Sequence, residues 1–263
     1  MPALARMLDI DFHEITDKGP VREQNEDSIG HWEHDGGLMF AVADGLGGHA
    51  AGEVASSVTL EVLAKSMTEA PASWPVTKRL RRAVQDANLE LHSKSLVVPE
   101  LHGMATTLTA SVVQGGMLVT AHVGDSRLLL LRGDELRQLT KDHTWVAEQV
   151  SYGRLTAEAA RTHPRRHHLT RSLGSELIVG IDVLSFTLEP GDVLIQCSDG
   201  IHGVLDEAAF RAGVATGSAE QACGHLLGAA IEAGSEDNLS VQVLAVRNCP
   251  APAPARPWWR FGR

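Results

Sequence analysis

The chain has 263 residues, of which 43% are hydrophobic and only 4% aromatic, so it can bury one large core built mainly of aliphatic side chains. Its formal net charge of −10 argues against nucleic acid or an anionic membrane as the main partner. The three cysteines lack the spacing of a disulfide framework or a zinc site, and no apolar run has the length of a membrane span or a secretion signal. We therefore expect a cytoplasmic protein without a transmembrane segment, and a monomer.

The first hundred residues change from a strand pattern to a helix pattern. Alternating apolar residues predict strands at 10–16, 28–33 and 38–43, and the dipeptides between the last two are typical of a hairpin. Apolar residues spaced at the helical period then predict helices at 50–67 and 78–95.

The strand pattern returns from residue 105 to residue 140. Two glycine-containing turns, at Gly115-Gly116 and Gly133-Asp134, separate short apolar runs, and such short connections predict an antiparallel meander. Short helices are expected at 144–153 and 156–161, the second with Thr156 as its N-cap. They surround a basic, histidine-rich segment at 163–172, which we interpret as a surface loop.

The last third of the chain predicts two strands, a helix and a final strand. Strands 181–188 and 192–198 are expected to meet across Glu189-Pro190-Gly191, followed by a helix at 218–234 and a strand at 239–246. Hairpins combined with paired helices predict an α+β fold in which two sheets pack together with helices outside. The domain is expected to span residues 1–248. Residues 249–263 form a Pro/Ala-rich tail that is either flexible or a docking segment carrying Trp258 and Trp259.

Acidic residues stand at the ends of several predicted core strands. Asp44, Asp125, Asp199 and Asp237 each border an apolar run, three of them in Asp-Gly or Asp-Asn turn dipeptides, and Glu26-Asp27 precedes another run. A single Asp-Gly is usually an ordinary turn. Two carboxylates at ~4 Å repel by roughly 4 kcal/mol at an effective dielectric near 20, so their repeated placement predicts a cation site. Oxygen ligands favour Mg²⁺ or Mn²⁺ over Zn²⁺.

Other catalytic motifs are absent from the sequence. No cysteine is followed by arginine at the spacing of a cysteine phosphatase, which disfavours a covalent cysteine mechanism. The chain also lacks a nucleotide-binding phosphate loop and an HExxH zinc motif.

Eight segments, taken in order, resemble the metal-dependent protein phosphatases of the PP2C (PPM) type, in particular their bacterial single-domain branch. The segments are VREQNED, FAVADGLGGHAAGE, GMATTLTA, AHVGDSRLLLLR, LTKDHT, HPRRHHLTRSLG, LIQCSDG and GSEDNLSV. The resemblance implies a four-layer α-β-β-α sandwich of two mainly antiparallel sheets flanked by helices. It also implies an enzyme that hydrolyses phosphoserine and phosphothreonine in proteins, and a mobile flap at residues 143–174.

The resemblance further implies how two tightly bound Mn²⁺ or Mg²⁺ ions would be held. Asp44 would bridge them, and Asp199 and Asp237 would complete the first site. Glu26 and the backbone carbonyl of Gly45 would serve the second site.

The same resemblance assigns roles to the remaining polar residues. Asp27 would hold a metal-bound water, although it could exchange roles with its neighbour Glu26, and Asp125 would help to bind a third, weaker ion. Arg22 would bind the phosphate, because its planar, always-charged fork suits phosphate oxygens. For the general acid, His49 and a metal-bound water remain open alternatives.

Other functions remain to be weighed against an active phosphatase. A pseudophosphatase without metals would not need this full set of carboxylates, and a nucleic-acid hydrolase is at odds with the acidic charge. Gly203 stands where some family members carry a further acidic residue, so the third metal site could be built differently. By analogy with bacterial relatives, phosphoproteins and an opposing Ser/Thr kinase are the expected partners.

Overall fold

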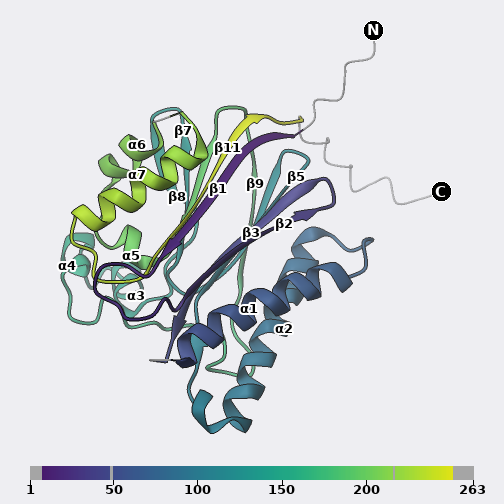
Figure 1. Ribbon diagram of the computed structural model, residues 1–263, viewed down its shortest axis with the longest axis vertical. Coiled ribbons are helices and arrows are strands. Elements are labelled where there is room, and N and C mark those ends of the chain that lie inside the picture. Colours follow the sequence, from purple (N-terminus) through teal and green to yellow (C-terminus); the bar gives the residue numbers. More distant parts are fainter. Residues whose placement is uncertain (1–7, 48–49, 216, 251–263) are drawn as a thin grey trace.

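The computed structural model describes residues 8–47, 50–215 and 217–250. Two β-sheets pack face to face, and helices cover the outer face of each sheet (Figure 1). Every strand pair within the sheets is antiparallel. This four-layer α-β-β-α arrangement confirms the fold class that the sequence predicts.

The first sheet has five strands in the order β1-β11-β10-β7-β8. Their bounds are β1 (Asp9–Asp17), β11 (Leu239–Asn248), β10 (Val193–Cys197), β7 (Arg127–Arg132) and β8 (Glu135–Gln138). The chain thus places its first and last described strands side by side, although they come from opposite ends of the sequence.

The second sheet has the order β2-β3-β5-β6-β9, with the short β4 paired to the end of β3. The bounds are β2 (Asp27–His34), β3 (Gly37–Leu46), β5 (Leu108–Gln114), β6 (Met117–Val123), β9 (Asp182–Thr187) and β4 (Ala105–Thr106). β9 is therefore an edge strand of this sheet, as β8 is of the other.

Long helices cover the second sheet and shorter ones cover the first (Figure 1). On the second sheet lie α1 (Ala50–Glu69) and α2 (Val76–Val97), followed by the 3-10 turn η1 (Pro99–Leu101). On the first sheet lie α5 (Asp199–His202), α6 (Glu207–Val214) and α7 (Ala219–Glu232). Two short helices, α3 (Trp145–Ser151) and α4 (Ala157–Arg161), belong to the expected flap, which follows β8 and precedes β9 in the chain. None of the helices in the described ranges is both long and apolar enough to cross a membrane.

Three apolar clusters hold the layers together. One lies between the second sheet and α1 and α2, another between the first sheet and α6 and α7, and the third between the two sheets. The third cluster contains aliphatic side chains around Phe40, which is only 1% exposed. As the composition predicts, the core is mainly aliphatic.

A chain of buried amides also joins the two sheets. In β10, Gln196 donates to the Thr109 carbonyl of β5 and accepts from Ser111, at 3.0 and 2.7 Å. Its amide also donates to Gln242 of β11, and Gln242 donates in turn to the Gly30 carbonyl of β2. Buried polar groups are costly unless paired, so these bonds specify one alignment of the sheets.

Two predicted strand pairings are wrong. Residues 105–140 do not form one meander, because β5 and β6 belong to the second sheet while β7 and β8 belong to the first. Strands β9 and β10 do not form a hairpin either, because the turn after Leu188 carries the chain from one sheet to the other. In both cases the connection is short because the sheets lie only about 10 Å apart.

Smaller differences concern element ends. Asp44-Gly45 lies within β3 and Asp199-Gly200 opens α5, so these dipeptides are not the sharp turns that were expected. α6 was not anticipated. The N-cap prediction for Thr156 is confirmed by its hydrogen bond from the Ala159 amide.

The core extends past the predicted boundary at residue 248, because Cys249 is 5% exposed and packs between the sheets. Residues 251–263 of the predicted tail lie outside the described residues.

Candidate active site

Five aspartates gather at one end of the sandwich, although they come from both sheets. They are Asp27 at the start of β2, Asp44 near the end of β3, Asp125 between β6 and β7, Asp199 after β10 and Asp237 before β11. Asp27 and Asp44 lie directly opposite each other in the β2–β3 ladder. The strand ends thus bring together carboxylates that are far apart in the sequence.

Asp44 is the centre of this cluster. Its pKa is raised well above the ordinary value, first by burial and then by the charges of Asp27, Asp199, Asp125 and Asp237. All four carboxylates are therefore within electrostatic reach of Asp44. Mutually repelling carboxylates in a buried position are stabilised by a bound cation.

Asp27 is held by hydroxyl groups of the first sheet. Burial raises its pKa to about 7, while hydrogen bonds from Ser240 and Ser198 act in the opposite direction. Ser198 Oγ donates to Asp27 Oδ2 at 2.7 Å and also accepts from the Ser240 amide at 3.1 Å. These serines fix the orientation of a carboxylate whose backbone belongs to the other sheet.

The backbone around Asp44 is fixed by Thr106 and Thr107, which come after α2 and η1 in the chain. Thr107 Oγ1 accepts from the Asp44 amide at 3.0 Å, and the Asp44 carbonyl accepts from the Thr107 amide and from Thr106 Oγ1, each at 2.8 Å. All donors and acceptors of this peptide are thus used, and the side chain is left to face the other carboxylates.

Gly45 allows a close approach between β3 and α1. A Cβ at this position would lie 2.1 Å from the Gly52 carbonyl oxygen and 2.6 Å from that of Glu26. The Gly45 amide donates to the same Glu26 carbonyl at 3.1 Å. Glycine is required here because no side chain fits, which explains the Asp-Gly pair better than a turn does.

Asn238 fastens the segment that carries Arg22 and Glu26 to the start of β11. Its Oδ1 accepts from the Glu26 amide at 2.8 Å, and its Nδ2 donates to the carbonyls of Lys18 and Gln24. The Arg22 guanidinium extends from this segment, half exposed, and donates to Asp237 Oδ2 at 2.7 Å. A cation open to solvent thus stands at the rim of the carboxylate cluster.

Asp125 lies where the chain crosses between the sheets. Burial raises its pKa well above the ordinary value, and the charges of Asp199 and Asp142 add to this effect. The preceding Gly124 exchanges hydrogen bonds with His143: its amide donates to His143 Nδ1 at 3.0 Å, and its carbonyl accepts from the His143 amide at 2.8 Å. His143 therefore ties the base of the flap to the Asp125 crossing.

Two histidines that the sequence did not single out lie at the cluster. His167 Nδ1 is 3.3 Å from Asp199 Oδ2, so this exposed flap residue is not merely part of a surface loop. His202 is half-buried, and its Nε2 donates to the Asp125 carbonyl at 2.9 Å. Burial raises the pKa of Asp199, but the hydrogen bond from His167 and the charge of His202 outweigh it, and the pKa falls below the ordinary value. The family motifs around both histidines were visible, but their contacts depend on tertiary structure.

The cysteines play no part in this site. Cys197 lies in β10 next to the cluster, and burial raises the pKa of its thiol to about 12. A thiol that stays protonated is not a nucleophile. This agrees with the absence of a cysteine-phosphatase motif.

Comparison with known proteins identifies the family. The model of the protein phosphatase 2C family matches residues 21–222, a range that includes every aspartate of the cluster except Asp237. The chain belongs to the protein phosphatase 2C family. This is a family of protein serine/threonine phosphatases, so the enzyme class expected from the sequence is confirmed.

Bacterial phosphatases are the relatives found. The serine/threonine phosphatase stp of Listeria innocua is 38% identical over 197 residues, which make up 73% of this chain and 78% of that protein. PstP of Mycobacterium tuberculosis is 37% identical over 232 residues, or 88% of this chain, but the chain spans only 44% of the length of PstP.

Solved structures of such phosphatases have the same fold. The crystal structure of M. tuberculosis PstP has a TM-score of 0.83 and 33% identity, and the match covers 91% of this chain and 99% of that one. A structure of the PstP catalytic domain in complex with two manganese ions has a TM-score of 0.81 and 32% identity, with the same coverage.

The donor set of the cluster fits divalent cations of this kind. The side chains that converge on Asp44 offer carboxylate oxygens, which Mg²⁺ and Mn²⁺ prefer. Within the described ranges, no three His, Cys, Asp or Glu side chains already form a finished ligand cluster. Instead, Asp237 contacts Arg22 and Asp199 contacts His167. The expected general acid, His49, lies outside the described residues.

Proposed function

We propose that this phosphatase hydrolyses phosphoserine and phosphothreonine in proteins at a centre of two divalent cations, Mn²⁺ or Mg²⁺. The observation that carries the proposal is the convergence of four carboxylates on the half-buried side chain of Asp44. Its relatives are named serine/threonine phosphatases, and one relative binds two manganese ions. We also propose that the enzyme opposes a Ser/Thr kinase in the cytoplasm and acts as a monomer.

Asp44 would bridge the two cations. Asp199 and Asp237 would complete one site, and Glu26 and the Gly45 carbonyl would complete the other. Bound ions of this type lower the pKa of a water molecule, which can then attack phosphorus in line near neutral pH. Asp27, whose carboxylate accepts from Ser198, would hold a metal-bound water or would exchange roles with Glu26.

Arg22 would bind the phosphate oxygens. It stands at the rim of the cluster, half exposed, with its guanidinium already directed at Asp237. Phosphate bound there would lie between a fixed cation and the metal centre, and Arg22 would stabilise the charge on the equatorial oxygens. The proton for the leaving serine or threonine oxygen would come from His49 or from a metal-bound water.

Asp125 would contribute to a third, weaker cation site. Its carboxylate is buried and raises the pKa of Asp44, but the two tight sites do not use it in this assignment. An ion held by fewer protein ligands keeps more water and binds more weakly.

A pseudophosphatase is the second candidate. It is disfavoured because the carboxylate cluster remains complete, and the mutual repulsion of its members would be a stability cost without a cation to offset it. Hydrolysis of nucleic acids is disfavoured by the net charge of −10.

Metal removal and replacement test the proposal. We expect turnover of a phosphothreonine peptide to be lost in EDTA and restored by Mn²⁺ or Mg²⁺. Asp44→Ala should reduce kcat by roughly 10²-fold or more, because no other group replaces a central electrostatic contact. The exposed Asp134→Ala, which makes the same change of charge, is the matched control. Full activity after exhaustive chelation, or in Asp44→Ala, would contradict the two-metal assignment.

A further inference from the structure

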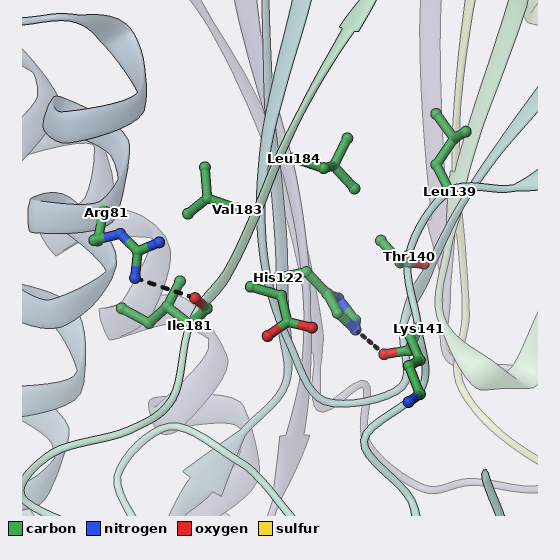
Figure 2. A pocket seen from close by; sticks show the side chains of 9 residues that line it. Arg81, His122, Leu139, Thr140, Lys141, Ile181, Val183 and Leu184 are labelled. Atoms are coloured by element: carbon green, nitrogen blue, oxygen red, sulfur yellow. Dashed lines mark hydrogen bonds between the residues drawn. The ribbon is translucent and has the colours of Figure 1, made fainter. Parts of the chain in front are cut away.

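The open side of the sandwich carries a groove between the edges of the two sheets (Figure 2). Its volume is about 420 Å³, and we call it the β9 groove. It is lined by Arg81, His122, residues 139–141 after β8, and residues 181–184 of β9 and its approach. None of these residues belongs to the carboxylate cluster.

The edge of β9 presents free backbone groups to this groove. The Leu188 amide donates to the Gly116 carbonyl across the β6–β9 pair, so the even-numbered residues direct their N–H and C=O groups at β6. The N–H and C=O groups of the odd-numbered residues point away from β6. At the two ends of the strand, arginine side chains bind the outward carbonyls: Arg81 donates to that of Ile181 and Arg132 to that of Thr187. Between them, Val183 and Ser185 face outward with no neighbouring strand in the described part of the chain.

The groove is positively charged although the protein is acidic. Arg81 and Lys141 line the groove, and the Arg137 guanidinium lies 5.0 Å from the centre of the Phe186 ring in β9. All three side chains are exposed, and none has an ion pair among the residues described. Asp182, the acidic residue in the lining, is already paired with Arg171 and His143, at 3.0 and 3.2 Å. Three unpaired cations therefore remain available to an anionic partner in a chain of net charge −10.

The groove also lies next to the catalytic end. His122 is at the end of β6, three residues before Asp125, and its Nε2 donates to the Lys141 carbonyl (Figure 2). Asp182 is the first residue of β9, and its carboxylate contacts His143 and Arg171 at the two ends of the expected flap. A partner bound along β9 would extend towards the active site.

We propose that the β9 groove is a docking site for an extended, acidic segment of the phosphoprotein substrate. The segment adds as a further strand to β9, pairs with the backbones of Val183 and Ser185, and places acidic side chains near Arg81, Arg137 and Lys141. A peptide satisfies both features at once, whereas a small anion leaves the strand edge unpaired. This docking role rests on the proposed phosphatase function and supplies its substrate specificity.

An unphosphorylated peptide of alternating Glu and Thr residues, labelled with fluorescein, tests the site on the full chain with Mn²⁺ bound. We expect binding by fluorescence anisotropy, and no binding of the same peptide with Lys in place of Glu. Hydrogen exchange should show new protection of the Val183 and Ser185 amides. No binding to the wild type, in a preparation that hydrolyses para-nitrophenyl phosphate normally, would overturn docking and leave the phosphatase function intact.

Paired variants separate the backbone contribution from the charge contribution. Ser185→Pro removes an outward N–H without removing a bond to β6, and Ser185→Thr retains it. Lys141→Glu reverses a charge at the groove, and Lys65→Glu makes the same change on exposed α1. We expect Ser185→Pro and Lys141→Glu each to weaken peptide binding about tenfold, and the two controls to have no effect.

The same variants should act on substrates that carry the acidic segment. We expect their KM for a phosphopeptide joined to that segment to rise about tenfold, with kcat and para-nitrophenyl phosphate turnover unchanged. Unchanged peptide affinity in both Ser185→Pro and Lys141→Glu would overturn the proposal. So would a wild-type dimer that Ser185→Pro dissociates, since a second copy of the chain would then occupy the edge. If no variant and no wild-type sample hydrolyses any phosphoester, the proposed function fails instead.

Discussion

Replacing Asp27 by asparagine should stabilise the metal-free protein at alkaline pH. Burial raises the pKa of Asp27 from 3.8 to about 7. The folded protein therefore binds this proton more tightly than the unfolded chain does. As the pH rises from about 4 to 7, the unfolded carboxyl group ionises freely, and the free energy of unfolding falls. Above pH 7 the folded protein carries the full cost of the buried charge.

The size of the effect follows from the two pKa values. Each pKa unit corresponds to about 1.36 kcal/mol, so Asp27 lowers the stability of the metal-free protein at pH 8 by at most about 4 kcal/mol relative to pH 4. In a domain of this size that equals roughly 10 °C in Tm. Asparagine retains the oxygen that accepts from Ser198 Oγ, so Asp27→Asn should remove the cost while keeping the contact.

Urea unfolding in EDTA at pH 5 and pH 8 measures this difference. We expect the wild type to lose stability between the two pH values, Asp27→Asn to lose up to about 2.7 kcal/mol less, and the exposed control Asp134→Asn to behave like the wild type. Added Mn²⁺ should stabilise the wild type more at pH 8 than at pH 5, because it binds the ionised carboxylates. The reasoning is refuted if Asp27→Asn and Asp134→Asn have the same pH dependence.

Three further substitutions test the site assignments. Arg22→Ala should raise KM for phosphopeptides by about 10- to 150-fold, the value of a charge-assisted contact of roughly 1.5–3 kcal/mol, and an unchanged KM and kcat would show that Arg22 does not contact phosphate. Gly45→Ala should destabilise the protein by about 1–3 kcal/mol or more in thermal unfolding, because its Cβ would lie 2.1 Å from the Gly52 carbonyl, and a wild-type Tm would contradict this packing. Asp125→Ala should keep two tightly bound ions in calorimetric titration while kcat falls strongly; loss of a tight site, or a full kcat, would exclude its assignment to the weaker third ion.

The aspartate cluster could be predicted from sequence because each of its members is marked locally. An acidic residue at the end of a buried apolar run is unusual, and strand ends in a sandwich gather at its two rims. The supporting residues carry no such mark. Asn238 and Ser198 are common polar residues next to motif aspartates, and their roles depend on bonds to Glu26 and Asp27, which are about 170–210 positions away in the chain.

The strand pairing was less predictable for a related reason. Glu189-Pro190-Gly191 predicts a turn, and a turn is present, but its residues do not determine whether the next strand returns to the same sheet. That choice is made by side chains on strands distant in sequence. Val193 to Cys197 pair with β7 and β11, and no pattern within residues 181–198 indicates this preference.

The amide chain through Gln196 and Gln242 has a consequence for how the enzyme tolerates change. These bonds prevent one sheet from sliding along the other, since any slip of a residue would leave several buried amides and carbonyls without partners. The positions of the aspartates at the rim of the sandwich therefore depend on hydrogen bonds in the middle of the molecule. Loops at that rim, the expected flap among them, can therefore change without altering how the aspartates of the two sheets lie relative to each other. A substitution such as Gln196→Leu would remove that restraint and should weaken metal binding and slow turnover together, although the hydrogen bonds of Gln196 are with Ser111, Thr109 and Gln242.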